Sequence, residues 1–238
     1  MQYAASRIIA YNEEENFRSV IISLIKRSHN TTVMRLLGTV CNFDPIYYNV
    51  AAVSNNAWLI ANFLTRKYPV SDNLTLKLAI YFGIPMMDLA HSYNITFHPD
   101  TIDTAIIHGK IALARHIHLR NYCDITPNTI GLLCGGKASY ADLKYFMMST
   151  TYQLHESLFI QALFAQNVSA VRLLLIIGCP TSDNIITMAT TSRNTKIKKL
   201  FNKWLLAGTP IASAVDIASA VDEKISADTL RAIKSLGL

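Results

Sequence analysis

The sequence predicts an all-α protein built as a solenoid of stacked helix–turn–helix repeats. Three observations predict this fold: short apolar segments pair around polar turns, the pairs recur at a regular period, and a small residue recurs within each pair. Of the 238 residues, 51% are hydrophobic and only 16% are charged. This composition favours many mutually buried faces and excludes an intrinsically disordered chain.

The helix pairing is clearest between residues 157 and 178. A short apolar segment ends in a polar turn at Asn167, and a leucine-rich segment then ends at Gly178, a residue that commonly terminates helices. Six such units have their turns at positions 55, 83, 109, 135, 166 and 193, with a mean period of about 28 residues. The predicted segment pairs are 46–54 with 57–67, 76–82 with 85–93, 102–108 with 111–121, 130–134 with 138–148, 157–167 with 168–178, and 185–192 with 196–207. Two helices per period indicate a solenoid.

A small residue lies four positions before each turn. These residues are Ala51, Ala79, Ala105, Gly131, Ala162 and Ala189. We expect them to let the neighbouring repeat approach closely. The loops between repeats contain the polar phrases Ser71-Asp72-Asn73, Pro99-Asp100-Thr101, Pro127-Asn128-Thr129 and Ser182-Asp183-Asn184. We expect their side chains to cap the first helix of the next repeat.

The two ends of the chain diverge from this pattern. An amphipathic segment at 14–28 and a second segment at 33–41 predict a divergent first repeat within an N-terminal cap, residues 1–44. Residues 211–238 contain two further short segments and many charged residues, as expected for a C-terminal cap. We therefore expect a single domain over 1–238, with the clear repeats at 45–210.

The repeat consensus resembles the ankyrin repeat over about residues 45–210. It combines the small residue, the turn and a Val-x-Leu-Leu-Leu-x-x-Gly phrase, which matches best at Ala170 to Gly178. The Thr-Pro-Leu-His opening is missing and the unit is shorter than the usual length of about 33 residues, so short or absent fingers are expected. Degenerate arrays of this kind are similar to host-interaction proteins of large DNA viruses, such as the asfarvirus multigene families, and of intracellular bacteria. The resemblance implies a protein–protein interaction scaffold, an effector in the host cytoplasm that binds and modulates a host signalling or immune protein.

No set of residues predicts catalysis, a cofactor or a metal site. The segment Gly131 to Ala138 is close to a phosphate-binding loop, but Ala138 stands where that loop needs a hydroxyl group. His116 and His118 are two residues apart, which places them on different sides of a helix. The four cysteines (Cys41, Cys123, Cys134 and Cys179) are widely spaced, which indicates free thiols. We expect a protein that is not an enzyme; a cysteine hydrolase would need a thiol within hydrogen-bond reach of a histidine.

The strongest charge feature of this chain, whose net charge is +6, is a basic cluster before and within the last predicted helix of the clear repeats. It comprises Arg193, Lys196, Lys198, Lys199 and Lys203. Lys196, Lys199 and Lys203 share one helix face. This face is interpreted as a solvated surface, as a site for an acidic protein or, as the alternative function, as a nucleic-acid site on helix 196–203. Interleaved aromatic residues, which stack on bases, are missing, so nucleic acid is the less favoured partner.

The first helices of a solenoid line its usual recognition surface. Positions two residues before and after the recurring small residue are expected to face solvent there. We predict as partner-binding residues Tyr47, Lys77, Tyr81, Asp103, Arg193, Lys196, Lys199 and Lys203. For any aromatic member, packing between repeats is the competing explanation. Because no apolar run is long enough to span a bilayer and no secretory signal is visible, we expect a soluble, cytoplasmic protein whose partner is another protein and not a membrane.

Overall fold

The computed structural model describes residues 2–39, 43–150 and 154–207, without the side chains of residues 2–13. Within these ranges the chain forms 14 α-helices and no strands, which confirms the all-α prediction. The chain divides into two compact units, Met1–Thr126 and Pro127–Leu238, and each is described by itself. The single domain over 1–238 stays a prediction, and the predicted C-terminal cap at 211–238 lies outside the described residues.

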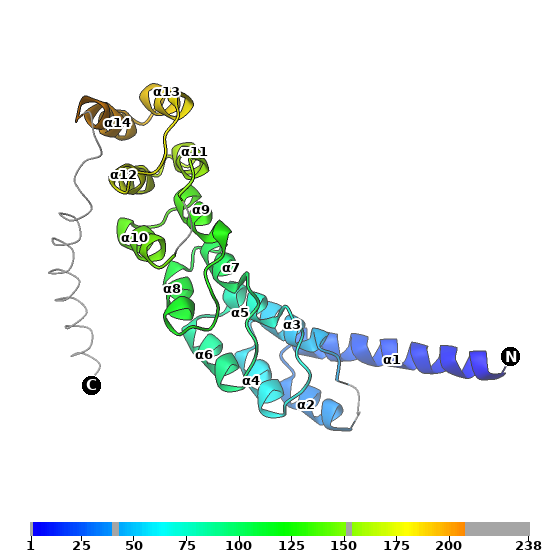
Figure 1. Ribbon diagram of the computed structural model, residues 1–238. Coiled ribbons are helices and arrows are strands. Elements are labelled where there is room, and N and C mark those ends of the chain that lie inside the picture. The colour runs from blue at the N-terminus through cyan, green and yellow to red at the C-terminus, as the bar shows by residue number, and fades with distance from the viewer. Residues whose placement is uncertain (1, 40–42, 151–153, 208–238) are drawn as a thin grey trace, which may run out of the picture. The chain divides into compact units, whose positions relative to one another are not determined.

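The first unit contains four consecutive helix pairs (Figure 1). They are α1 (Gln2–Lys26) with α2 (Asn30–Thr39), α3 (Ile46–Val53) with α4 (Ala57–Thr65), α5 (Leu74–Tyr81) with α6 (Ile84–Ser92), and α7 (Thr101–Ile107) with α8 (Ile111–Leu119). The first helices pack side by side in the order α1, α3, α5, α7, and α4, α6 and α8 form a second row. Helix α1 extends well beyond the others of this unit and begins at Gln2, whereas the sequence predicted a start at residue 14.

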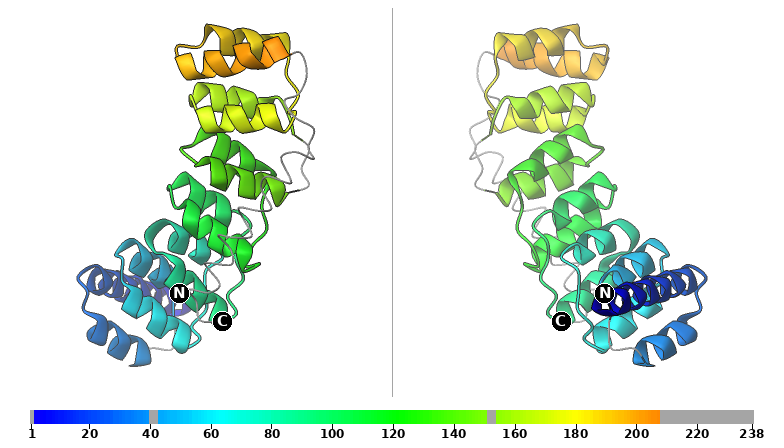
Figure 2. Two further views of the ribbon diagram at one scale, coloured as in Figure 1. Left: turned by 90° about the vertical axis from the view of Figure 1, so that its left-hand side faces the viewer. Right: turned by 90° about the vertical axis from the view of Figure 1, so that its right-hand side faces the viewer.

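The second unit contains three helix pairs, which lie in successive layers (Figure 2). They are α9 (Pro127–Gly135) with α10 (Tyr140–Met148), α11 (Ser157–Phe164) with α12 (Val168–Ile176), and α13 (Asp183–Thr191) with α14 (Thr195–Ala207). Helices α9, α11 and α13 form one row, and α10, α12 and α14 form the other. In both units, sequential helix pairs are stacked as the repeat period predicted.

The recurring small residues lie at the contacts between first helices. All five alanines of this set are fully buried, and Gly131 is buried on α9. A Cβ atom added to Gly131 would lie 2.6 Å from Oε1 of Gln161 on α11, so the neighbouring helix pair approaches closely at this position. This packing agrees with the prediction that the small residues let the neighbouring repeat approach closely.

Three of the predicted caps of the first helices, those of α5, α7 and α13, are wrong. Asn73, Asp100 and Ser182 are the residues that precede α5, α7 and α13, and none of their side chains makes a capping hydrogen bond. Side-chain caps occur instead at the starts of α4, α10 and α12, from Asn56, Ser139 and Asn167. At α7, the preceding loop is held instead by hydrogen bonds of His98 with Thr75 of α5 and Thr101 of α7.

Candidate interaction surfaces

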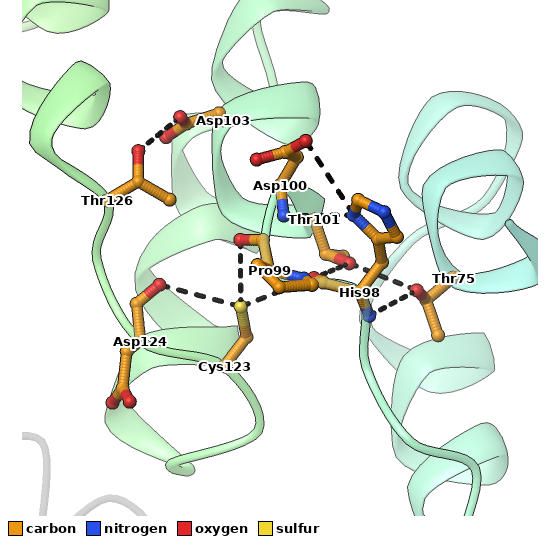
Figure 3. A network of polar contacts seen from close by, with 9 residues as sticks. All are labelled: Thr75, His98, Pro99, Asp100, Thr101, Asp103, Cys123, Asp124 and Thr126. Carbon is orange, nitrogen blue, oxygen red and sulfur yellow. Dashed lines mark hydrogen bonds and ion pairs between the residues drawn. The ribbon is translucent and has the colours of Figure 1, made fainter. Parts of the chain in front are cut away.

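A buried polar network holds α5, α7 and the loop between α6 and α7 together (Figure 3). The hydroxyl groups of Thr75 on α5 and Thr101 on α7 lie 3.0 Å apart. The His98 backbone N–H donates to Oγ1 of Thr75 at 3.0 Å, and Oγ1 of Thr101 donates to the His98 carbonyl at 2.6 Å. Both threonines are buried. The network therefore fixes the spacing of α5 and α7 near the residues where both helices begin.

Two of the predicted partner-binding side chains are buried in this unit. Asp103 is 6% exposed, and Oγ1 of Thr126 donates to its Oδ2 at 2.5 Å from the loop that follows α8 (Figure 3). Tyr47 is 2% exposed because it precedes Ala51 by four residues and shares its inward face. Its ring packs at 5.4 Å, edge to face, against Phe43. The structure thus corrects the prediction that Tyr47 and Asp103 lie on an exposed surface.

An exposed row of large side chains follows the ends of the first helices. Val53, Tyr81 and Ile107 are the last residues of α3, α5 and α7, and are 56%, 39% and 64% exposed. Each lies two residues after the recurring alanine, so the three occupy equivalent positions on helices that pack side by side. We call these three residues the apolar stripe. Of these three residues, only Tyr81 was among the predicted site residues. Val53 and Ile107 can be found in the sequence because each is an apolar residue two positions after the recurring alanine.

A groove of about 390 Å³ runs between α5 and α7 beside the stripe. We call it the α5–α7 groove; its lining residues are Asn73, Leu76, Lys77, Ile80, Thr104, Ile107 and His108. The predicted site residue Lys77 is half-buried here, and no acidic residue lines the groove. At the adjacent end of α5, Nζ of Lys110 donates to the carbonyls of Ile80 and Phe82, both at 2.6 Å. Burial lowers the pKa of the Lys110 ammonium group.

In the second unit, α14 presents a basic face. The predicted residues Lys196, Lys199 and Lys203 are exposed, as is Arg193 just before the helix. On the other side of α14, Ile197 and Phe201 are fully buried. The sequence of α14 contains no acidic residue. We call Lys196, Lys199 and Lys203 the α14 basic face; it matches the placement that the sequence predicted.

The neighbouring second helices α6 and α8 are joined by a polar cluster. Nε2 of His116 donates to Oδ1 of Asp88 at 2.6 Å, and the Tyr122 hydroxyl donates to the same atom at 2.9 Å. The Tyr122 ring also stacks on the ring of His91, with centroids 4.0 Å apart. Burial by itself would raise the pKa of Asp88, but the hydrogen bonds from His116 and Tyr122 outweigh it and lower that pKa. His116 is thus engaged in joining two repeats.

The described thiols lie in surroundings that disfavour a thiolate. Cys123 donates to the carbonyls of Pro99 at 3.1 Å and of His98 at 3.4 Å (Figure 3). Burial raises the pKa of Cys134 to about 12 and that of Cys179 to about 11. A cysteine nucleophile needs a lowered pKa and a base beside its sulfur. The absence of enzymatic activity stays a prediction.

The glycine-rich segment that resembles a phosphate loop is the end of a helix. Residues 131–135 belong to α9, and within the described part of the chain no strand precedes them. Nδ2 of Asn167 donates to the carbonyls of Leu133, Cys134 and Gly136 and so caps this end of α9. In the same part of the chain, no cluster of three or more histidine, cysteine or carboxylate side chains could hold a metal ion.

Comparisons of the chain with protein-family models, with curated proteins and with solved structures found no match. Among the described residues, no helix is both long and apolar enough to cross a membrane. Two exposed surfaces remain as candidate binding sites: the apolar stripe with the α5–α7 groove in the first unit, and the α14 basic face in the second.

Proposed function

We propose that this protein is an ankyrin-like repeat scaffold that binds another protein through the apolar stripe. The observation that carries the proposal is that Val53, Tyr81 and Ile107 are exposed at the same position of three successive repeats. A single exposed apolar side chain is ordinary on a protein surface and needs no explanation. Three at equivalent positions on adjacent helices form a row, and contiguous exposed apolar surface is typical of interaction sites.

The chemistry of the stripe suits protein recognition. Tyrosine is enriched among the residues that dominate binding energy at interfaces, and its polar hydroxyl group allows it to stay exposed in the free protein. The α5–α7 groove beside Tyr81 and Ile107 offers a concave surface in which a partner side chain can be desolvated. Together with the resemblance to viral and bacterial effectors, these features support a role in binding and modulating a host signalling or immune protein.

The test compares two double variants of the full chain as bait in affinity purification with quantitative mass spectrometry. Val53→Ser with Ile107→Ser removes two members of the stripe. The control, Trp58→Ser with Leu119→Ser, removes two side chains of the second helices in the same unit, which are 48% and 60% exposed. We expect a set of proteins that the unmodified chain and the control retain and the stripe variant loses. Equal recovery by all three baits would contradict the proposal.

A second function, nucleic-acid binding, is favoured by one observation: three exposed lysines share a face of a helix without acidic residues. Phosphate binding by such a face releases counterions and weakens steeply as salt rises. Fluorescence anisotropy with a labelled single-stranded oligonucleotide measures this. Binding that is unchanged by salt, or by Lys196→Glu, Lys199→Glu and Lys203→Glu together, would eliminate this function.

A further inference from the structure

We propose that the α5–α7 groove selects a partner segment in which an acidic residue lies close to a large apolar side chain. The inference rests on the proposed function and specifies its partner. The carboxylate would lie at Lys77 and His108, and the apolar side chain would pack on Ile80, Ile107 and Tyr81. Four observations support it: the charge of the lining, the state of the nearby helix end, the apolar wall and the size of the groove.

The lining of the groove carries one positive charge, that of Lys77. Lys77 lies on α5 and His108 follows α7, so the two side chains reach the groove from its opposite walls. None of the lining residues is acidic, and the described residues contain no ion pair that involves Lys77. Asn73 and Thr104 add neutral hydrogen-bonding groups. A carboxylate is the group that this set of donors complements.

The end of α5 would ordinarily disfavour an anion at this place. Helix C-termini carry a partial negative charge from their unpaired carbonyl groups. Here the Lys110 ammonium group binds the carbonyls of Ile80 and Phe82 at 2.6 Å, and its positive charge offsets part of that partial charge. An acidic partner residue therefore meets little repulsion from the backbone beside Tyr81.

The remaining walls of the groove are apolar. Leu76 and Ile80 project from α5 at a four-residue spacing, and Ile107 faces them from α7. A volume of about 390 Å³ is at the small end of the range of ligand-binding pockets, which suits a few side chains of one segment. Nucleic acid fits less well, because its affinity depends on several cations along the backbone and on stacking rings, whereas Lys77 is the one lysine of the lining.

The experiment selects random 12-residue peptides displayed on phage against the full chain. One enriched peptide is then synthesised with a fluorescent label, and its affinity is measured by fluorescence polarisation. We expect the enriched peptides to carry Asp or Glu within a few residues of Leu, Ile, Phe or Trp. Lys77→Glu should weaken binding about tenfold, because it removes an ion pair and adds a repulsion. The control Lys67→Glu, an equal charge change outside the groove in the same unit, should leave binding unchanged.

A charge exchange keeps the test valid if Lys77→Glu perturbs the fold. A peptide in which the acidic residue is replaced by Lys should bind the Lys77→Glu variant better than it binds the unmodified chain. If a peptide binds the Lys77→Glu variant normally but does not bind the Ile107→Ser variant, the partner segment does not need an acidic residue. This result would overturn the inference and leave the proposed function standing. Peptide binding could instead be weakened by the combined substitutions Lys196→Glu, Lys199→Glu and Lys203→Glu and left unchanged by Ile107→Ser. That result would overturn the groove as the site where the peptide binds. A labelled oligonucleotide that competes with the peptide in a Lys77-dependent way would assign the groove to nucleic acid and contradict the proposal.

Discussion

The apolar stripe and the α14 basic face are both exposed, yet they differ in what the fold requires of them. A helix that packs on one side must expose polar residues on the other, so lysines on the outer side of α14 follow from amphipathicity alone. Packing does not require Val53 and Ile107 to be apolar, because each is more than half exposed and its position would accept a polar residue. Exposed apolar residues that repeat without a packing reason indicate recognition more strongly than exposed charges do.

The largest expected effect separates the two surfaces directly. Tyr81→Ala with Ile107→Ala should weaken a partner identified by affinity purification about a hundredfold, since each truncation removes a central apolar contact. Lys196→Glu, Lys199→Glu and Lys203→Glu together should change the same affinity less than about threefold, as is typical of charges outside an interface. Isothermal titration calorimetry measures both. The reverse order of effects would contradict the difference drawn between the surfaces.

Salt provides the next largest effect. If a single-stranded oligonucleotide binds the three lysines of α14, raising salt from about 50 to 250 mM should weaken that binding about thirtyfold. The triple charge-reversed variant should then show almost no salt dependence. Anisotropy measured across this range with both proteins gives the slopes, and equal slopes would show that the oligonucleotide binds elsewhere.

The third prediction concerns the support beneath the groove. Thr101→Val removes the hydrogen bonds to Thr75 and to the His98 carbonyl, both in buried surroundings. We expect a loss of about 1.5 kcal/mol in the free energy of unfolding, because buried polar groups are left unpaired. Thr191→Val, which removes a hydrogen bond within an exposed helix end, is the control and should cost less than about 0.5 kcal/mol. Urea unfolding followed by circular dichroism measures both free energies. Equal losses for the two variants would show that the buried network stabilises the fold no more than a hydrogen bond at an exposed helix end does.

The smallest expected effect is a pH dependence in the first unit. Because the folded-state pKa of Asp88 is lowered, its contribution to stability is present above the unfolded-state pKa of about 3.9 and is lost as pH falls through the folded value. The carboxylate is 41% exposed, so the contribution should stay below about 1 kcal/mol. Thermal unfolding between pH 6 and pH 3 should therefore show a slightly steeper loss for the unmodified chain than for Asp88→Asn. Identical profiles would contradict a stabilising role of the cluster with His116 and Tyr122.

The sequence predicted the helix pairs well because their signals are local. Apolar periodicity, turn residues and the recurring small residue all act within one repeat, and most predicted boundaries lie within about three residues of the observed ones. The start of α1 was missed because the chain before residue 14 lacks a clear amphipathic pattern. The cap expected at α7 did not form; the loop before α7 is held instead by Thr75 of α5, whose hydroxyl group accepts from the His98 backbone N–H.

The candidate site was predicted only in part, because burial depends on neighbouring repeats. Lys77 and Tyr81 lie at the groove or the stripe, and the lysines of α14 are exposed as expected. Asp103 is buried because a loop more than twenty residues later in the chain covers it with Thr126. Lys77 stands at the same repeat position as Asp103 but remains accessible. Repeat position alone therefore does not decide exposure.

Hydrogen–deuterium exchange of the full chain, with and without its purified partner, shows whether the partner binds at the apolar stripe. Binding should protect the amides at the ends of α5 and α7, residues 78–83 and 104–110, and leave those of α14 unchanged. Ile107→Ser should abolish this protection at partner concentrations that saturate the unmodified chain. Protection confined to α14, with none at the ends of α5 and α7, would contradict the assignment of the apolar stripe as the binding surface.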